Sequence, residues 1–225
     1  MTPESGEDRS EEGPLGFVAV STPRFRESIA RQQATLSSEE FSAFILAIRS
    51  VFETYSAKLS AYEPGVERGT ALHKIMDETT KTAAHVKVSC CKGCSGCCHY
   101  EVEITNDEAV VLASIVRGGL AIDASQLSNQ AARERRAPAW SDVLHPSNRC
   151  VFLGEDNACR VYESRPSVCR RMLVTSPAEA CSKPGQPVTP VEILLAEILL
   201  SAALSLAGSS FGSLSKMLLA SLPAA

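Results

Sequence analysis

Apolar residues recur at helical spacing through the first third of the chain. Ser37 and Glu40 have the spacing of a capping box, and the apolar positions over 41–62 then fall every three or four residues, which predicts a long amphipathic helix. Residues 63–65 read Glu-Pro-Gly and end it, and a second helix is predicted over 67–86. We therefore expect two antiparallel helices whose aromatic side chains belong to the core.

The middle of the chain contains two further helical patterns. Thr105 and Glu108 again have capping-box spacing, and the helix that they open is expected to end at Gly118-Gly119. Another helix is predicted over 123–136.

Short β-type runs then surround a turn-rich stretch. Cys150-Val-Phe-Leu and Cys159-Arg-Val-Tyr flank Gly154, which predicts a small hairpin with a cysteine near each end. Arg165-Pro166 is expected to start a short helix that carries Cys169, because proline is well tolerated in a first turn.

The C-terminal part is strongly apolar. Residues 184–190 include three prolines and read as a linker, whereas 191–207 contain only Glu192 and Glu197 as charged residues. Because a buried carboxylate is costly in hydrocarbon, we expect a core or oligomerisation helix and not a membrane span. A last amphipathic helix, over 211–218, is expected to fold back on it.

These patterns predict a mainly α fold with a small β-hairpin, in which a compact cysteine-cluster metal-binding domain packs with flanking helices. The expected parts are a disordered acidic tail (1–22), an N-terminal helical hairpin (23–88), the cysteine-cluster domain (89–183), and a Pro-rich linker with C-terminal apolar helices (184–225).

Charge and composition exclude some functions. The net charge of −4 is that of the first sixteen residues alone, and no basic run with interleaved aromatic residues indicates nucleic-acid binding. The N-terminal residues lack the basic and apolar segments of a signal peptide, and the cysteine count of nine is odd. We therefore expect a cytoplasmic protein whose thiols bind a metal or do chemistry, and not a disulfide framework.

The cysteine spacing carries the main chemical signal. Cys91, Cys94 and Cys97 follow each other at steps of three, as in the ferredoxin-type run in which three thiolates hold one face of a [4Fe-4S] cube. Zinc needs only four thiolates in a tetrahedron. Spacing therefore favours an iron-sulfur cluster only slightly over zinc.

Eight cysteines are candidate ligands. Cys97 and Cys98 are adjacent, so their side chains are expected to diverge, and either they reach different metals or one of them is structural. One centre or two would fit the number of thiols, and His99 could replace a thiolate. His73 is expected at the surface or the core edge, and His85, although near the cysteines in sequence, is not favoured as a ligand. The candidate metal ligands are Cys91, Cys94, Cys97, Cys98, Cys150, Cys159, Cys169 and Cys181.

Arginines accompany the later cysteines. Arg165 lies four residues before Cys169, and Arg170 follows it. Four thiolates around Zn²⁺ or a [4Fe-4S]²⁺ core carry a net charge of about −2, which nearby guanidinium groups would stabilise. Arg165 and Arg170 are therefore the predicted cofactor-supporting residues.

The motif resembles that of a known family. Cys91 to Cys98 match the CxxCxxCC motif of a family of zinc- or iron-chelating cysteine-cluster proteins, and the stretches from Cys150 and from Cys159 through Arg165-Pro166 to Cys169-Arg170 are similar to its downstream pattern, except for valine at Val151. The resemblance covers about residues 90–172. It implies a metal-chelating domain, related to the cluster domain of flagellin lysine N-methylases.

Several functions remain open from the sequence. The first is an iron-sulfur protein in redox or methyl-transfer-linked chemistry, as an oxidoreductase or part of a methyl-transfer system, although no S-adenosylmethionine loop is recognisable. The second is a zinc-stabilised interaction module without catalysis. A thiol enzyme is disfavoured because Cys98 and His99 are adjacent and make a poor dyad. An unidentified protein or redox partner is expected, and the C-terminal helices could join two copies of the chain.

Overall fold

The computed structural model describes residues 21–141, 145–183 and 185–223. The predicted acidic tail over 1–22 lies almost entirely outside the described residues. The described helices are α2 (Pro23–Thr35), α3 (Ser38–Ser60), α4 (Val66–Thr80), α5 (Asn106–Arg117), α6 (Ala124–Ala131), α7 (Ser167–Arg171), α8 (Leu194–Ser205) and α9 (Leu214–Ser221). Strands β1 (Glu103–Thr105) and β2 (Phe211–Ser213) form an antiparallel pair. The predicted mainly α fold with a small antiparallel β element is confirmed.

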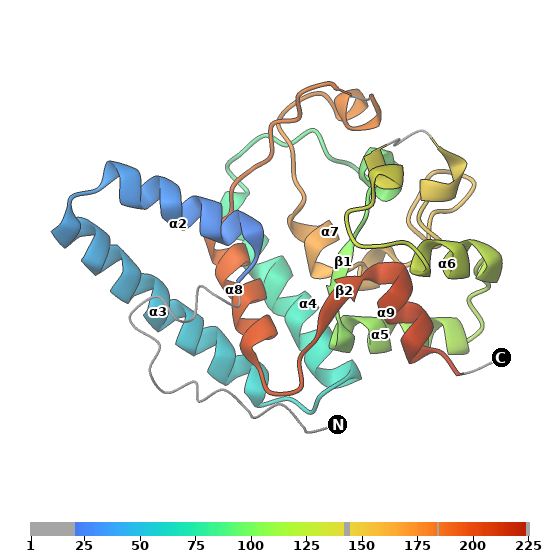
Figure 1. Cartoon of the computed structure of the whole chain (residues 1–225), viewed down its shortest axis with the longest axis horizontal. Helices are drawn as coiled ribbons and strands as arrows, with labels where there is room; N and C mark the ends of the chain where they lie inside the picture. The colour runs from blue at the N-terminus through green and yellow to red at the C-terminus, as the bar shows by residue number, and fades with distance from the viewer. Residues whose placement is uncertain (1–20, 142–144, 184, 224–225) are drawn as a thin grey trace, which may run out of the picture.

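The helices form two groups with a central layer between them. Helices α2 and α3 lie together on one side of the molecule, and α5, α6, α9 and the sheet lie on the other (Figure 1). Between them, α4 contacts α5, α7 and α8. Helix α7, which carries Cys169, is therefore held at the centre of the fold.

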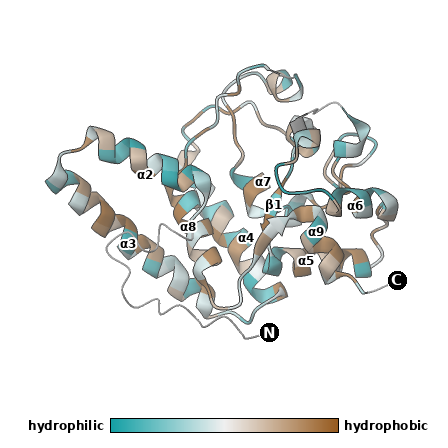
Figure 2. Ribbon diagram, in the orientation of Figure 1, coloured by the Kyte–Doolittle hydropathy of each residue, from teal (hydrophilic) through white to brown (hydrophobic). Residues whose placement is uncertain are grey.

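The predicted long helix is confirmed as α3. Ser37 accepts a hydrogen bond from the backbone of Glu40, whose carboxylate in turn accepts from Ser37, so the capping box is complete. Figure 2 shows hydrophobic and hydrophilic residues alternating along α3, as expected of an amphipathic helix. Its buried side packs mainly against α8, so α4 is not its principal neighbour.

Helix α2 was not predicted from the sequence. Only Phe25 and Ile29 are buried, too few apolar positions to give a clear helical period. Thr22 nevertheless caps the helix by accepting a hydrogen bond from the Phe25 backbone, and Pro23 occupies the first turn.

Helix α8 is part of the core, as predicted for the apolar segment 191–207. Every residue from Ala196 to Ala203 is buried, and α8 contacts α2, α3 and α4. Glu197 is accommodated there because it pairs with Arg171 and accepts a hydrogen bond from Thr22 Oγ1 at 2.8 Å. Among the described helices, none combines the length and apolarity that crossing a membrane requires.

Three local predictions need correction. Helix α9 packs on α5 and α6, where Leu214 and Leu218 are buried, and does not fold back on α8. The predicted hairpin over 150–162 contains only one isolated bridge, between Leu153 and Cys159, and the regular strand pair joins β1 to the distant β2. The helix predicted over 123–136 ends at Ala131.

A buried carboxylate joins three elements of the central layer. Glu108 Oε1 accepts a hydrogen bond from Ser167 N at 2.7 Å and lies 3.2 Å from His73 Nε2, while Oε2 accepts from Thr105 N at 3.0 Å. Thr105 and Glu108 form the predicted capping box of α5. His73 is buried on α4, so the expectation of a surface or core-edge position for it is wrong.

The ionised form of Glu108 is strongly favoured. Burial raises the pKa of this carboxyl, but the hydrogen bond and charge of His73 and the backbone donors Ser167 and Thr105 outweigh burial and lower the pKa from 4.5 to about 2. Ser167 opens α7 and lies two residues before Cys169. Glu108 therefore fixes the position of the helix that carries this cysteine.

We predict that Glu108→Gln lowers the free energy of unfolding by roughly 3 kcal/mol near neutral pH. The pKa of Glu108 is lower in the folded protein than in the unfolded chain. Its ionised carboxylate therefore stabilises the fold above pH 4.5, the pKa of an unperturbed glutamate, and this stabilisation is lost as the pH falls toward about 2. Urea denaturation across this pH range should show that the difference in free energy of unfolding between the wild type and Glu108→Gln becomes smaller in acid. Glu39→Gln, at an exposed position, serves as control. A difference in free energy of unfolding that stays constant in acid would contradict the lowered pKa of Glu108.

Candidate metal centre

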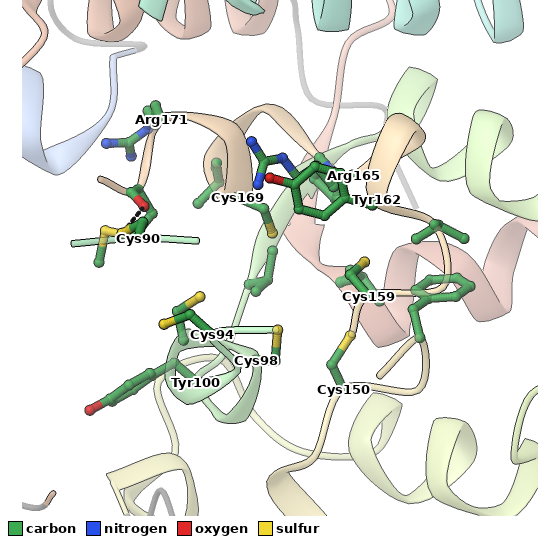
Figure 3. Close-up of a pocket in the computed structure, with 18 of the residues that line it drawn as sticks. Cys90, Cys94, Cys98, Tyr100, Cys150, Cys159, Tyr162, Arg165, Cys169 and Arg171 are labelled. Atoms are coloured by element: carbon green, nitrogen blue, oxygen red, sulfur yellow. Dashed lines mark hydrogen bonds between the residues drawn. The ribbon is translucent and has the colours of Figure 1, made fainter. Parts of the chain in front are cut away.

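Cysteine side chains from four parts of the chain line one cavity of about 250 Å³. Figure 3 shows Cys90 and Cys94 on one side of this cavity and Cys150 and Cys159 on the other. All nine cysteines are free thiols. The cysteines that line the cavity are Cys90, Cys91, Cys94, Cys97, Cys98, Cys150, Cys159 and Cys169.

The first cysteine segment folds as two consecutive tight turns. Cys94 N donates to Cys91 O at 3.0 Å, and the turn between them places Gly93 at φ 87°, a conformation that favours glycine. A 3₁₀ helix, η3 (Gly96–His99), follows and carries Cys97 and Cys98. The three-residue steps of the motif therefore become turns that bring successive thiols to one side of the loop.

A second 3₁₀ helix supports this loop from behind. η3 packs on η7 (Ala178–Ser182), which carries Cys181, and Tyr100 donates to the backbone oxygen of Cys181 at 3.2 Å. The two segments approach closely at Gly96, where an added Cβ would lie 2.7 Å from Cys181 Cβ. Glycine at this position is thus required by close packing.

The opposite wall comes from residues 150–169. Cys150 N donates to Cys98 O at 2.8 Å, which joins this wall directly to the first cysteine segment. Cys150 and Cys159 lie near the two ends of one tight turn, closed by Gly154 N and Ala158 O at 2.8 Å. Helix α7 adds Cys169.

Backbone amides of other residues donate to at least four of the described sulfur atoms. The donors are Val174 N for Cys90, at 3.3 Å, Gly96 N for Cys94, Phe152 N for Cys150 and Val161 N for Cys159. In the last three cases the donor is the residue two positions after the cysteine. Each of these hydrogen bonds lowers the pKa of its thiol and favours the thiolate, which is the form that binds metals.

Burial and mutual repulsion oppose ionisation of the same thiols. Burial raises the pKa of Cys150 to about 11, and the pKa of Cys169 is raised by burial and then by charge on Cys97, Cys150 and Cys159. The pKa of Cys97 is raised first by its hydrogen bond with Cys98 and then by burial. These shifts favour the protonated thiols of Cys97, Cys150 and Cys169, so a metal that binds there must displace their protons.

Three guanidinium groups line the cavity: those of Arg24, Arg165 and Arg171. Arg165 lies over the ring of Tyr162, 4.3 Å from its centroid, and its buried Nε has no hydrogen-bond partner among the described residues. Its charge lowers the pKa of Cys97 and Cys159, opposing the stronger effect of burial on both. Positive charge thus faces the thiols at short range.

Arg170, predicted to support the cofactor, does not line the cavity. Its guanidinium is buried against α4, where it pairs with Asp77, and it donates to the backbone oxygens of Arg165, at 2.7 Å, and Glu163. These contacts hold the start of α7 in place. The neighbouring Arg171 points to the cavity instead, with Glu197 as its partner.

Comparison with known families agrees with this geometry. Residues 90–184 match the family model CxxCxxCC, described as "Putative zinc- or iron-chelating domain". We call this matched segment, residues 90–184, the CxxCxxCC domain. Neither the comparison with curated proteins nor that with solved structures gave a match.

The CxxCxxCC domain brings together seven of the eight predicted cysteine ligands. Cys181 lies behind the first cysteine segment and does not line the cavity. Cys90 lines the cavity although it was not among the predicted ligands, and its position directly before Cys91 was the only signal for it in the sequence. His99 lies outside the lining, with Nδ1 3.2 Å from Ser95 O, and His85 is exposed.

The donor set fits zinc or iron-sulfur chemistry. The ligand atoms that face the cavity are mainly soft sulfurs, which suit zinc and iron-sulfur clusters and not calcium or magnesium. Over the described residues, no three or more His, Cys, Asp or Glu side chains already have the arrangement of a metal-ion site.

We predict that Gly96→Ala separates η3 from η7 and destabilises the protein by about 1–3 kcal/mol, because the new methyl group would overlap Cys181. Urea denaturation measures the change. Gly118→Ala is the matched control, since its Cβ would meet nothing closer than 3.3 Å. Equal stability of the Gly96→Ala and Gly118→Ala proteins would show that the two segments do not pack as described.

Proposed function

We propose that the CxxCxxCC domain binds an iron-sulfur cluster of the [4Fe-4S] type and acts in redox or methyl-transfer-linked chemistry. The observation that supports this proposal is the cavity itself, with thiols on opposite walls. The proposed ligands come from the eight cysteines named from the sequence, with at least one from Cys91–Cys98 and at least one from the downstream wall; Cys181, which does not line the cavity, is the exception. When bound, such a cluster supplies one-electron transfer.

The size of the cavity favours a cluster over a single ion. A tetrahedral zinc site draws four sulfurs to about 2.3 Å from one point and leaves no space between them. The cavity of about 250 Å³ is instead several times the roughly 30 Å³ that one water molecule occupies. Thiols arranged around such a volume suit a group of several atoms.

The charge and polarity of the lining support the same proposal. Four thiolates around a [4Fe-4S]²⁺ core carry a net charge of about −2, which Arg24 and Arg165 would help to offset, whereas Arg171 is already paired with Glu197. Phe152, Val161 and other apolar side chains complete the walls and keep water away from the sulfurs. This lining would protect a cluster and tune its potential.

The biological setting is also a proposal. The free thiols fit a reducing compartment, so we place the protein in the cytoplasm. Cys91 and Tyr100 are exposed beside the cavity, and this is where we expect a redox partner to approach. Methyl transfer enters only through the family resemblance, and association of two copies through α8 and α9 stays a prediction.

We predict that anaerobically purified protein contains iron and acid-labile sulfide in equal amounts, with the brown colour of a cluster. Cys159→Ser and Cys169→Ser should each lose most of both, because each removes a thiol from the downstream wall. Val168→Ala is the control, since it changes the lining next to Cys169 without removing a thiol. Colourless wild-type protein with stoichiometric zinc would contradict the cluster and favour a zinc-stabilised module.

We also predict that Arg165→Gln makes the reduction potential of the bound cluster more negative. Reduction adds negative charge, and the guanidinium of Arg165 stabilises that charge across the cavity. A redox titration followed by absorption measures the shift. Arg31→Gln, at an exposed ion pair with Glu192, removes the same charge at a distance and should leave the potential unchanged. Equal reduction potentials in all three proteins would show that Arg165 does not act on the bound cluster.

A further inference from the structure

The first turn of α2 reaches one end of the thiol cavity. Of the described residues of this helix, Arg24 is the one that lines the cavity, and its Nη2 lies 3.8 Å from Met172 Sδ on the same lining. The buried side chains of α2, Phe25 and Ile29, belong instead to a hydrophobic cluster with α3 and α8. Arg24 is therefore the direct link between this helix and the cysteines.

The charge of Arg24 is not used in an ion pair among the described residues. Over that part of the chain, the basic residues that form ion pairs are Arg31, Arg68, His73, Arg135, Arg170 and Arg171. Arg171 also lines the cavity, but its charge is compensated by Glu197. Arg24 thus presents to the cavity a positive charge that no described carboxylate compensates.

Glu197 joins α8 to two other elements through its two carboxylate oxygens. Oε1 accepts a hydrogen bond from Arg171 Nη1, and Oε2 accepts one from Thr22 Oγ1 at 2.8 Å. The side chains of Arg171 and Glu197 are only 12% and 9% exposed. Because a carboxylate removed from water is stable only with such donors, both contacts are strongly favoured.

Thr22 passes this attachment on to α2. Its hydroxyl oxygen accepts a hydrogen bond from Phe25 N at 3.2 Å, as a helix N-cap does, while the hydroxyl donates to Glu197. Thr22 is itself buried, and Arg24 follows it by two residues, in the first turn. The buried carboxylate therefore fixes the turn of helix from which Arg24 enters the cavity lining.

The residue that Arg24 contacts is held from the same point. Arg171 ends α7, and Met172, the contact of Arg24, follows it directly. Met172 O also lies 3.7 Å from Cys90 Sγ, so this contact is beside the thiols. Figure 3 shows Arg171 on the Cys90 side of the cavity, apart from Arg165. Arg24 and Arg165 therefore bring their charges to different parts of the lining.

We propose that Glu197 is a positioning residue of the metal centre. Through Thr22 it holds the guanidinium of Arg24 at the cavity, and through Arg171 it holds the end of α7 beside that guanidinium. The inference rests on the proposed function and adds to it a residue that does not itself line the cavity. Since positive charge near a cluster stabilises its reduced form, loss of this attachment should make the reduction potential more negative.

The first test changes Thr22, which breaks the attachment of α2 and leaves the ion pair of Glu197 with Arg171 in place. Thr22→Val removes the hydroxyl at nearly constant side-chain volume. In the anaerobically purified full chain, we expect Thr22→Val to shift the reduction potential in the same direction as Arg24→Gln. Thr22→Ser keeps the hydroxyl and should have the wild-type potential.

A second change removes the carboxylate itself. Glu197→Leu with Arg171→Leu replaces the buried ion pair by apolar side chains and leaves the net charge unchanged, while Thr22 can still cap α2. Because the charges removed cancel, we expect the potential to move through displacement of Arg24, again to a more negative value.

A double-mutant cycle decides whether both changes act through Arg24. In the Arg24→Gln background, neither Thr22→Val nor the double replacement should shift the potential further. Thr35→Val, at the exposed other end of α2, is the matched control and should leave the potential unchanged, since its hydroxyl bonds to the preceding turn of the same helix. Circular dichroism and iron content check the fold and the cluster. Arg24→Gln alters a partly exposed side chain, so it decides the question even if another variant does not fold.

Arg24→Gln protein with the wild-type potential would overturn the inference, because the charge of Arg24 would then not reach the cluster. Shifts that persist at full size in the Arg24→Gln background would do so as well, and so would a Thr22→Ser shift as large as that of Thr22→Val. These outcomes leave the proposed function intact. Wild-type protein without a cluster would overturn the proposed function, and this inference with it.

Discussion

The carboxylate of Glu108 is buried where the helical scaffold meets the cysteine-bearing loops. It caps α5 through Thr105, contacts His73 on α4 and accepts from Ser167 at the start of α7. Losing this ion would weaken the attachment of α7, which carries Cys169 and which Arg170 also holds through Asp77 on α4. The geometry of the cavity thus depends on one charged group that lies outside it.

The two walls of the cavity are held in different ways. Residues 150–169 are tied to α4, α5 and α6 through buried side chains such as Phe152 and through the guanidinium of Arg170. The segment from Cys90 to Cys98 has only turns and the 3₁₀ helix η3, supported by η7. Because this segment has little regular structure of its own, the loop wall is the part whose order a bound metal would increase most.

Local signals in the sequence were sufficient for much of the fold. Both capping boxes, at Ser37 and Thr105, were predicted because their residues contact each other within one turn. The pairing of β1 with β2 was missed because it joins segments that are distant in the sequence. Helix α2 was missed because its stability comes from burying Phe25 and Ile29 against other helices.

In the candidate site, too, some features could be predicted from local sequence and others depend on tertiary packing. Cysteine spacing predicted the chemistry and most of the residues that line the cavity, since the turn at Cys91–Cys94 follows from local sequence. The choice between Arg170 and Arg171 depends on how α7 is rotated about its axis, which contacts with Asp77 and Glu197 decide. The exclusion of Cys181 from the lining likewise depends on the packing of η7 behind Gly96.

The most direct test of a cysteine-lined metal centre is anomalous diffraction at the iron and zinc absorption edges from crystals of anaerobically purified protein. Anomalous density inside the cavity, in contact with thiolates from both Cys91–Cys98 and the segment over 150–169, is the result expected here. Crystals of metal-loaded protein in which the density lies elsewhere, or contacts only one of these two segments, would contradict it.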